Sequence, residues 1–157
     1  CAIQFGGSAK MLDESVRAEF PAANLQRDPA FLSPWASQLR AHLDGRLQTL
    51  DIPLDIQATA FQRRVWEYLQ TIPYGRTDTY GQIAKQIGRP LAARAVARAC
   101  ASNPVAVAIP CHRVVRGDGE MGGYRWGVER KQKLLRMEKS TKKSGVGGPA
   151  QPARLPH

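Results

Sequence analysis

The dipeptide Asn103-Pro104 constrains the fold of this chain more than any other local feature. Proline disfavours the helical conformation of the residue before it, so a helix that reaches Ser102 must end there and the chain must continue extended. Residues 105–109 form an uninterrupted apolar run, which predicts a buried strand. Such a strand delivers Pro110-Cys111-His112-Arg113 to its end, where a cysteine is well placed for chemistry.

Two predicted helices separated by a glycine turn precede this break. A short helix is expected over residues 80–87, the turn Gly88-Arg89-Pro90 interrupts it, and an alanine-rich helix follows over residues 91–102. This order is the outline of a helix-turn-helix motif. Any pair of core helices can show the same outline, so the pattern alone does not establish DNA binding.

Positive charge is concentrated around these helices. Residues 59–136 contain 14 basic and five acidic side chains, a net charge of +9 in a chain of net charge +10. Arg94 and Arg98 lie one turn apart on the alanine-rich helix, where small side chains such as Ala93 allow close approach to a phosphate-lined groove. The charge favours a polyanionic partner, because each neutralised phosphate releases condensed counterions. A merely soluble basic surface is the alternative.

We expect an α/β fold of the α+β kind, with three parts. Residues 1–58 form a small mixed N-terminal lobe, with helices over 11–20 and 35–43 and a short strand over 50–56. Residues 59–139 form a mainly helical lobe that carries the helix-turn-helix and a loop with the active-site cysteine. Residues 140–157 lack apolar periodicity and are predicted to be a disordered tail.

The location of the protein is inferred from what the sequence lacks. No window approaches the roughly 18 consecutive apolar residues that a membrane span requires. Three cysteines cannot form a full set of disulfides, which favours a reducing compartment, and we expect the bacterial cytoplasm. The chain begins abruptly within an apparent strand, so we expect it to be a fragment of a longer protein.

The helices that flank the cysteine segment have clear core stripes. Thr59 is expected to cap a helix in which Phe61, Val65 and Leu69 recur every four residues, and Trp66 and Tyr68 are assigned to the core with Phe61. In the final predicted helix, residues 127–139, four positions follow a 3, 4, 3 spacing and share one face: Val128, Lys131, Leu135 and Glu138. Glu138 is therefore expected to point inward.

Cys111 and His112 combine a soft nucleophile with a titratable base. Their positively charged surroundings are expected to lower the pKa of the thiol. Adjacent residues of a strand face opposite ways, so a direct hydrogen bond between them requires a bend or a bridging water. Glu138 is the natural third member, accepting from the other imidazole nitrogen. An inert buried thiol is the alternative for Cys111, and Cys100 is assigned no role.

Other candidate motifs are weaker. Residues 117–122 match the G-x-G-x-x-G dinucleotide pattern, but no strand-loop-helix-strand unit surrounds them, so a flexible loop that closes over a ligand is the simpler interpretation. His42 is placed on the polar side of a helix and completes no metal site, and we expect no metal. Tyr80 and Tyr124 flank the basic helix and the glycine loop, and these two rings are candidates to line a base-sized pocket.

The segment Ile109-Pro110-Cys111-His112-Arg113-Val114-Val115 is very similar to the active-site signature of the methylated-DNA protein-cysteine methyltransferases. The resemblance extends over residues 59–138, and residues 116–128 resemble the Ada-type branch of that family. It implies that a guanine methylated at O6 is flipped out of double-stranded DNA and that a cysteine takes its methyl group irreversibly. Each protein then acts once, and the resemblance implies no metal, nucleotide or S-adenosyl donor.

The resemblance also implies roles for individual residues. Cys111 corresponds to the methyl acceptor, His112 to a water-linked base and Glu138 to the carboxylate that orients it. Asn103 corresponds to a hinge after the recognition helix, and Tyr80 to a tyrosine that crowds a phosphate. Arg94 corresponds to the arginine that fills the space left by the flipped base. The full set expected to contact guanine or DNA is Ala93, Arg94, Arg98, Arg113, Val114, Tyr124 and Arg125.

Further features of the family remain expectations. The helix-turn-helix is expected in the minor groove and the protein is expected to be a monomer. Arg125 stands where many members have serine, which leaves the range of accepted alkyl groups open. Whether a zinc-bearing regulatory half precedes Cys1 is also open. Two rival functions are a binding module that grips lesions without transferring the alkyl group and a cysteine hydrolase that uses Cys111 and His112. The cysteine opposes the first, and the DNA-binding helices oppose the second.

Overall fold

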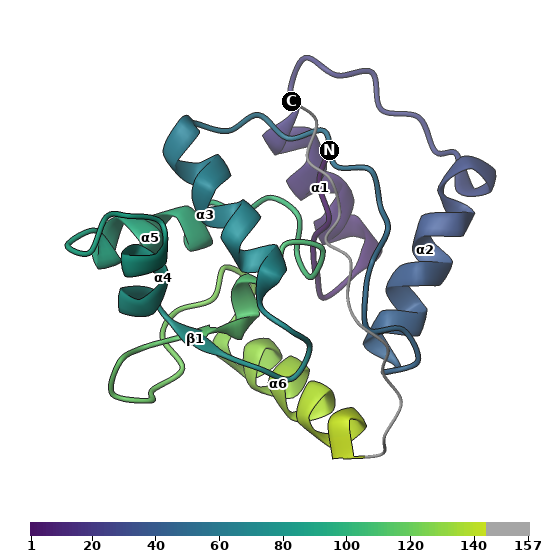
Figure 1. The fold of residues 1–157 in the computed structure, drawn as a ribbon. Coiled ribbons are helices and arrows are strands. Elements are labelled where there is room, and N and C mark those ends of the chain that lie inside the picture. Colours follow the sequence, from purple (N-terminus) through teal and green to yellow (C-terminus); the bar gives the residue numbers. More distant parts are fainter. Residues whose placement is uncertain (144–157) are drawn as a thin grey trace.

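The computed structural model describes residues 1–143 and confirms the expected α+β class (Figure 1). Short strands pair within an otherwise helical chain. In chain order the elements are α1 (Ala9–Glu19), α2 (Pro29–Leu43), α3 (Ala60–Thr71), β1 (Asp78–Thr79), α4 (Tyr80–Gln86), α5 (Ala93–Ala101), the 3-10 helix η1 (Cys111–Arg113), β2 (Val114–Val115) and α6 (Val128–Lys143). None of the helices within the described range is long and apolar enough to cross a membrane.

Capping side chains explain where several helices begin. Thr59 accepts a hydrogen bond from the backbone of Gln62, whose side chain bonds back to the backbone of Thr59, and this capping box confirms the predicted start of α3. Thr79 and Gln82 form the same arrangement before α4. Helix α2 begins at Pro29, earlier than the predicted residue 35, because Asp28 caps it and proline suits the first helical position.

Helix α5 ends just before Asn103-Pro104, as the proline predicts. Helix α5 ends at Ala101, and Val105 then pairs with Ile3 in an isolated parallel bridge. The rest of the predicted strand over 105–109 is wrong, because the segment curls into a turn in which Ile109 N donates to Val105 O at 3.2 Å and Val107 has φ +70°. The apolar run reflects burial, which a turn enclosed by the core satisfies as well as a strand does.

The predicted strand over residues 50–56 is also wrong. The segment has no strand partner, yet Ile52 and Leu54 are buried while Asp51 and Pro53 are exposed. An extended chain that lies on the core produces this alternation without a neighbouring strand. The alternation of apolar and polar residues therefore reflects burial in this segment and not strand pairing.

Two short strands connect the cysteine segment to the helical pair. β1 and β2 are parallel, with Asp78 opposite Val114 and Thr79 opposite Val115. Because α4 follows β1 directly and β2 follows η1 directly, this pairing holds Cys111–Arg113 beside the start of α4. The position of the cysteine thus depends on residues more than 30 positions earlier.

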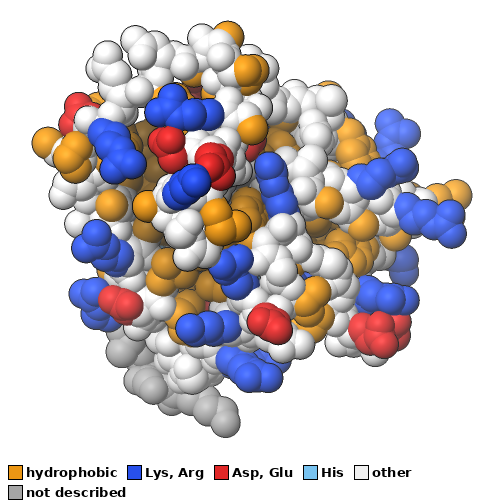
Figure 2. All heavy atoms as spheres, turned by 180° about the vertical axis from the view of Figure 1, so that it is seen from behind, with side chains coloured by type: hydrophobic (Ala, Val, Ile, Leu, Met, Phe, Trp, Pro, Cys, Tyr) orange, Lys and Arg blue, Asp and Glu red, His pale blue; other side chains and the backbone are white. Residues whose placement is uncertain are grey.

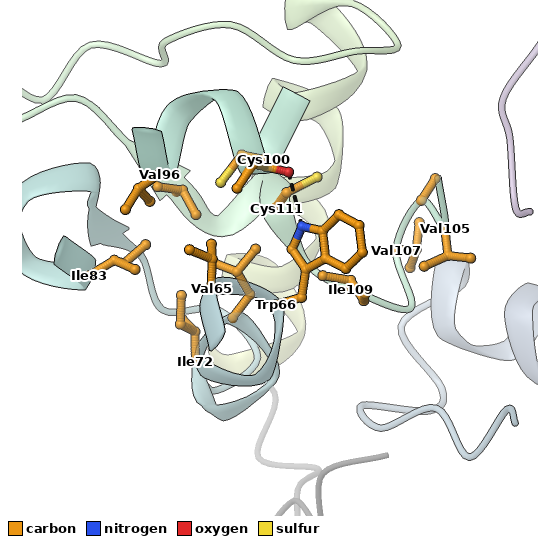
Figure 3. Packing of buried hydrophobic residues seen from close by; sticks show 14 of the residues in the cluster. Val65, Trp66, Ile72, Ile83, Val96, Cys100, Val105, Val107, Ile109 and Cys111 are labelled. Atoms are coloured by element: carbon orange, nitrogen blue, oxygen red, sulfur yellow. Dashed lines mark hydrogen bonds between the residues drawn. The ribbon is translucent and has the colours of Figure 1, made fainter. Parts of the chain in front are cut away.

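The core lies between α3, α5 and the 105–109 turn (Figure 3). Trp66 is 2% exposed, and its indole Nε1 donates to the carbonyl of Ala99 at 2.9 Å, which joins α3 to α5. Phe61 and Tyr68 are only partly buried and pack against the edge of this core. The two cysteines Cys100 and Cys111 belong to the same buried cluster, although they come from different elements.

Helices α4 and α5 form the predicted helix-turn-helix outline. They contact each other, and Gly88, at φ +72°, makes the turn between them. Arg94 and Arg98 are exposed on α5, whereas Ala93 is half-buried. Figure 2, which views the molecule from behind, shows Lys and Arg side chains on the edge where α4 and α5 lie. The face available to a polyanion is therefore basic.

Helix α6 confirms the predicted inward face in its main part. Lys131, Leu135 and Glu138 are buried, while Val128 at the start of the helix is 41% exposed. The helix continues to Lys143, so residues 140–143 are helical and not part of a tail. The predicted disorder of residues 144–157 lies outside the described residues.

His42 departs from its predicted polar position. It is 2% exposed, and its ring meets the edge of Tyr74 with centroids 5.3 Å apart, because α2 turns this side chain toward the segment that follows α3. Burial and the nearby positive charge of Arg113 lower the pKa of His42 to about 4. This histidine is consequently neutral in the folded protein at neutral pH.

Replacing His42 with leucine is expected to make stability less sensitive to acid. Between pH 6.5 and 4 the unfolded chain binds a proton that the folded chain refuses, so the contribution of His42 to the free energy of unfolding falls as the pH decreases. From pH 7 to 4.5 the loss is about 2–3 kcal/mol. Urea unfolding at both pH values should show that much less loss in His42→Leu. Equal losses in both proteins would contradict the assignment.

Candidate active site

Cys111 occupies the first position of η1, at the junction between the core turn and β2. The side chain is buried, with 3% exposed, and its backbone N donates to the carbonyl of Ile109 at 2.8 Å. Residues 111–113 form a 3-10 turn, so Cys111 and His112 do not alternate across a sheet. No hydrogen bond joins the side chains of Cys111 and His112 in the described structure, because His112 Nε2 bonds to Glu138 and Nδ1 has no partner.

Asn103 ties this turn to the end of α5. Its side-chain Nδ2 donates to Cys111 Sγ at 3.2 Å and to the carbonyl of Ile109 at 2.9 Å, and its Oδ1 accepts from Val105 N at 3.0 Å. The Asn103 side chain is fully buried, so these contacts satisfy a polar group that would otherwise be costly to bury. The residue before the proline thus positions the thiol sulfur directly.

Glu138 forms the centre of a buried charged network. Its carboxylate accepts from His112 Nε2 at 2.7 Å, from the backbone N of Gly75 at 2.9 Å and from the Arg113 guanidinium in a forked contact at 3.0–3.2 Å. Arg113 also donates to the carbonyl of Ile72 at 2.7 Å. The pairing of His112 with Glu138 predicted from the spacing on α6 is present in the structure.

The network determines the protonation of the imidazole. Burial alone raises the pKa of Glu138, but the bond from His112 and the charge of Arg113 outweigh it and lower the value to about 2. Burial lowers the pKa of His112, with Glu138 acting in the opposite direction. A neutral His112 that donates Nε2–H to the carboxylate leaves Nδ1 as an acceptor, and Nδ1 has no partner among the described residues. The free nitrogen is available as a base.

The expected lowering of the thiol pKa is wrong for the protein alone. Burial raises the pKa of Cys111 to about 11, although Asn103, Lys131 and Arg125 each act to lower it. Positive charge in the sequence is distributed along the chain, but desolvation depends on the packing around the sulfur. The resting cysteine is a thiol, so its reaction as a nucleophile requires a base to take the proton.

The glycine loop, residues 116–127, lies beside this thiol. Tyr124 contacts the His112 ring edge to face, with centroids 6.5 Å apart. A Cβ atom on Gly122 would lie 3.0 Å from the hydroxyl of Tyr80, so this glycine lets the loop approach Tyr80 closely. Tyr80 and Tyr124 are both partly buried, and each packs against the core cluster that contains Cys111.

The structure gathers only part of the predicted set of residues. Cys111, His112, Glu138, Asn103 and Tyr124 are joined by the contacts above, and Arg125 bonds to the Asn103 carbonyl at 3.2 Å. Val114 is buried in β2, while Ala93, Arg94 and Arg98 lie on α5.

Arg113 requires a correction. It was expected to contact DNA, but its side chain is buried and its guanidinium is committed to Glu138 and Ile72. The Arg113 guanidinium stays inside the protein because the buried carboxylate of Glu138, removed from water, is stabilised by a neighbouring cation.

Two groups that contact the site were not identified from the sequence, the backbone N of Gly75 and the side chain of Lys131. The backbone N of Gly75 donates to Glu138, and a backbone donor of this kind leaves no signal in the residue types. Lys131 is fully buried, and its Nζ donates to the carbonyls of Met121 and Gly123 in the glycine loop. Its place on the inward face of α6 was the available signal. Within residues 1–143 there is no cluster of His, Cys, Asp or Glu that could hold a metal ion.

Comparisons with known proteins agree with this geometry. Residues 60–140 match the family described as 6-O-methylguanine DNA methyltransferase, DNA binding domain. The chain is 49% identical over 138 residues to the bifunctional transcriptional activator/DNA repair enzyme Ada of Escherichia coli, covering 88% of this chain and 39% of that protein. It is 50% identical over 113 residues to the methylated-DNA--protein-cysteine methyltransferase of Mycobacterium bovis, covering 72% of this chain and 68% of that protein.

Solved structures show the same relationship. The Mycobacterium tuberculosis OGT in complex with DNA is 50% identical and aligns with a TM-score of 0.68 over 69% of this chain and 68% of that chain. The O6-methylguanine-DNA methyltransferase of the archaeon Pyrococcus kodakaraensis, 29% identical, aligns with a TM-score of 0.58 over 82% of this chain and 76% of that chain. The similarity therefore includes both the sequence and the fold.

Proposed function

This chain belongs to the 6-O-methylguanine DNA methyltransferase family, and from that premise we propose that it repairs DNA by moving a methyl group from O6 of guanine to Cys111. The observation that carries the proposal is the geometry of the buried thiol. Cys111 is the neighbour in sequence of a histidine whose Nε2 is held by Glu138 and whose Nδ1 lacks a partner among the described residues.

The reaction follows from the protonation states. His112 Nδ1 takes the proton of the Cys111 thiol, directly or through one water molecule, and Glu138 stabilises the imidazolium that forms. The thiolate then attacks the methyl carbon in line with the C–O bond. A C–S bond forms as the C–O bond breaks, and guanine leaves with the electron pair and takes up a proton. The thioether is stable, so each chain reacts once.

The partner we propose is double-stranded DNA that carries an alkylated guanine. The similar protein from M. tuberculosis was crystallised in complex with DNA, and residues 59–136 of this chain carry a net charge of +9. We assign α5 to the minor groove, with exposed Arg94 filling the space of the flipped base and Arg98 near the phosphates. Extrusion of a base costs a few kcal/mol, so a side chain that replaces it stabilises the open duplex.

Further assignments complete the proposal. Tyr80 crowds a phosphate, Asn103 serves as the hinge after α5, and Val114 and Tyr124 contact the guanine. We infer that residues 59–139 are the DNA-binding and catalytic part and that residues 1–58 support it. We also infer a monomer that acts on nucleoid DNA in the bacterial cytoplasm.

A single-turnover experiment tests this function. Duplex DNA carrying one radiolabelled O6-methylguanine is mixed in excess with the protein, and the label is followed after separation of protein and DNA. Label on the protein at a stoichiometry near one methyl group per chain is expected. Tight binding without movement of label would instead support the binding module, and repeated turnover of a small ester would support the cysteine hydrolase.

A further inference from the structure

Arg125 lies between the two lobes of the molecule. Its Nη1 donates to the carbonyl of Asn103 at 3.2 Å, and its Nη2 lies 3.4 Å from Glu19 Oε2 at the end of α1. The side chains of Arg125 and Glu19 are 35% and 25% exposed, so the pair is partly shielded from solvent. One guanidinium therefore connects the N-terminal lobe to the residue whose side chain bonds to the cysteine sulfur.

Aromatic contacts hold the same segment of the glycine loop. The Arg125 guanidinium lies over the ring of Trp126, 5.6 Å from its centroid, and Trp126 is only 9% exposed. Trp126 meets Phe5 and Tyr124 edge to face, with centroids 6.2 and 5.3 Å apart. Tyr124 in turn meets the ring of the base His112. Residues 124–126 are thus enclosed between the N-terminal segment and the catalytic histidine.

Glu19 is held in place for this contact. Gln4 Nε2 donates to the same carboxylate oxygen that faces Arg125. Gln4 follows Ile3, whose backbone pairs with Pro104 and Ala106 on either side of Val105. The carboxylate is therefore anchored to the turn that leads to Cys111, which restricts its freedom before Arg125 binds.

We propose that Glu19 and Arg125 are positioning residues for methyl transfer: the N-terminal lobe uses this ion pair to hold residues 124–126 closed beside Cys111. The proposal rests on the proposed function and deepens it, because it gives residues 1–58 a direct part in the reaction. The positive charge of Arg125 also favours the thiolate form of Cys111, because it acts to lower the pKa of that thiol.

The test compares Glu19→Gln, Arg125→Gln and the double variant with Glu14→Gln. Glu14 lies on the same helix and is exposed, 3.8 Å from Lys10, so it is a matched control. At saturating O6-methylguanine duplex, both single variants are expected to transfer methyl about three- to fivefold more slowly, as for a partly exposed ion pair. The double variant should be no slower than Arg125→Gln, because the two residues act through one contact.

Two further readouts separate positioning from a structural role. The dissociation constant for the same duplex should change by less than about twofold in Glu19→Gln. The pH dependence of the transfer rate should shift upward in Arg125→Gln, which loses a cation, and not in Glu19→Gln, which retains it. Two outcomes would overturn the proposal. In the first, the rate reduction of the double variant equals the product of the two single reductions. In the second, Glu19→Gln transfers methyl as fast as Glu14→Gln.

Hydrogen exchange keeps this test separate from the proposed function. Backbone amides of residues 121–127 are expected to exchange several-fold faster in Glu19→Gln than in Glu14→Gln, whether or not methyl is transferred. If the unmodified protein transfers no methyl, the proposed function fails while the exchange result still tests the ion pair. Unchanged exchange in Glu19→Gln would show that the ion pair does not hold the loop.

Discussion

Replacing Cys111 with alanine is expected to abolish transfer of radiolabelled methyl from duplex DNA to the protein. The reaction forms a bond between the methyl carbon and the sulfur of Cys111, so no partial activity can remain when that atom is absent. Binding of the methylated duplex should persist, because the exposed arginines of α5 are untouched. Scintillation counting of the separated protein gives the first result, and a gel-shift titration gives the second.

Cys100 provides the matched control for this variant. It is also a buried thiol, its pKa is raised further above the ordinary value than that of Cys111, and its neighbours in sequence are two alanines in place of a histidine. Cys100→Ala should therefore accept as much label as the unmodified protein. If Cys111→Ala still takes up label, or Cys100→Ala does not, the methyl acceptor is not Cys111 alone and the proposed chemistry is refuted.

Replacing Glu138 with glutamine is expected to weaken both the fold and the reaction. The change leaves the buried guanidinium of Arg113 without its countercharge, and breaking a buried ion pair in this way costs about 3–5 kcal/mol. His112 loses the anion that stabilises its protonated form, so transfer should slow by roughly 100-fold, the lower end of what general base catalysis supplies. Urea unfolding and single-turnover transfer measure the two effects.

The stability difference between the unmodified protein and Glu138→Gln should depend on pH. Since the pKa of Glu138 is lowered to about 2 in the folded protein, its stabilisation is complete above the ordinary value near 4.5 and declines as the pH falls from there toward 2. The two proteins should therefore converge in acid. Glu67→Gln, which changes an exposed carboxylate on α3, should have little effect at any pH. A transfer rate unchanged in Glu138→Gln would mean that Glu138 only supports the fold.

Helices were predicted well where local side chains determine them. The caps at Thr59 and Thr79 act within one turn of the residues that they bond, so nearby sequence is sufficient to place the starts of α3 and α4. The inward position of Glu138 was predictable for the same reason, because the period of a helix carries one stripe of residues toward the core. The pairing of His112 with Glu138 then followed from chemistry.

Strands were predicted poorly because pairing is not local. Residues 50–56 and 105–109 have the apolar pattern of strands, but they bury their side chains without forming a ladder. The pair that does form, β1 with β2, is two residues long on each side and has no apolar pattern to announce it. Its partners are brought together by the packing of α4 against the core.

The sequence by itself determined the chemistry available to this protein: a cysteine next to a histidine, a glutamate on the inward face of α6, a basic helix pair and the break at Asn103-Pro104. Only the tertiary structure decided how these groups behave. Packing raised the pKa of Cys111, enclosed His42 and turned Arg113 from the surface to Glu138, and an ion pair joined Arg125 to Glu19 at the end of α1. The physical reason is that desolvation and charge pairing depend on atoms brought close by the fold, whereas residue type and helical spacing are properties of the chain.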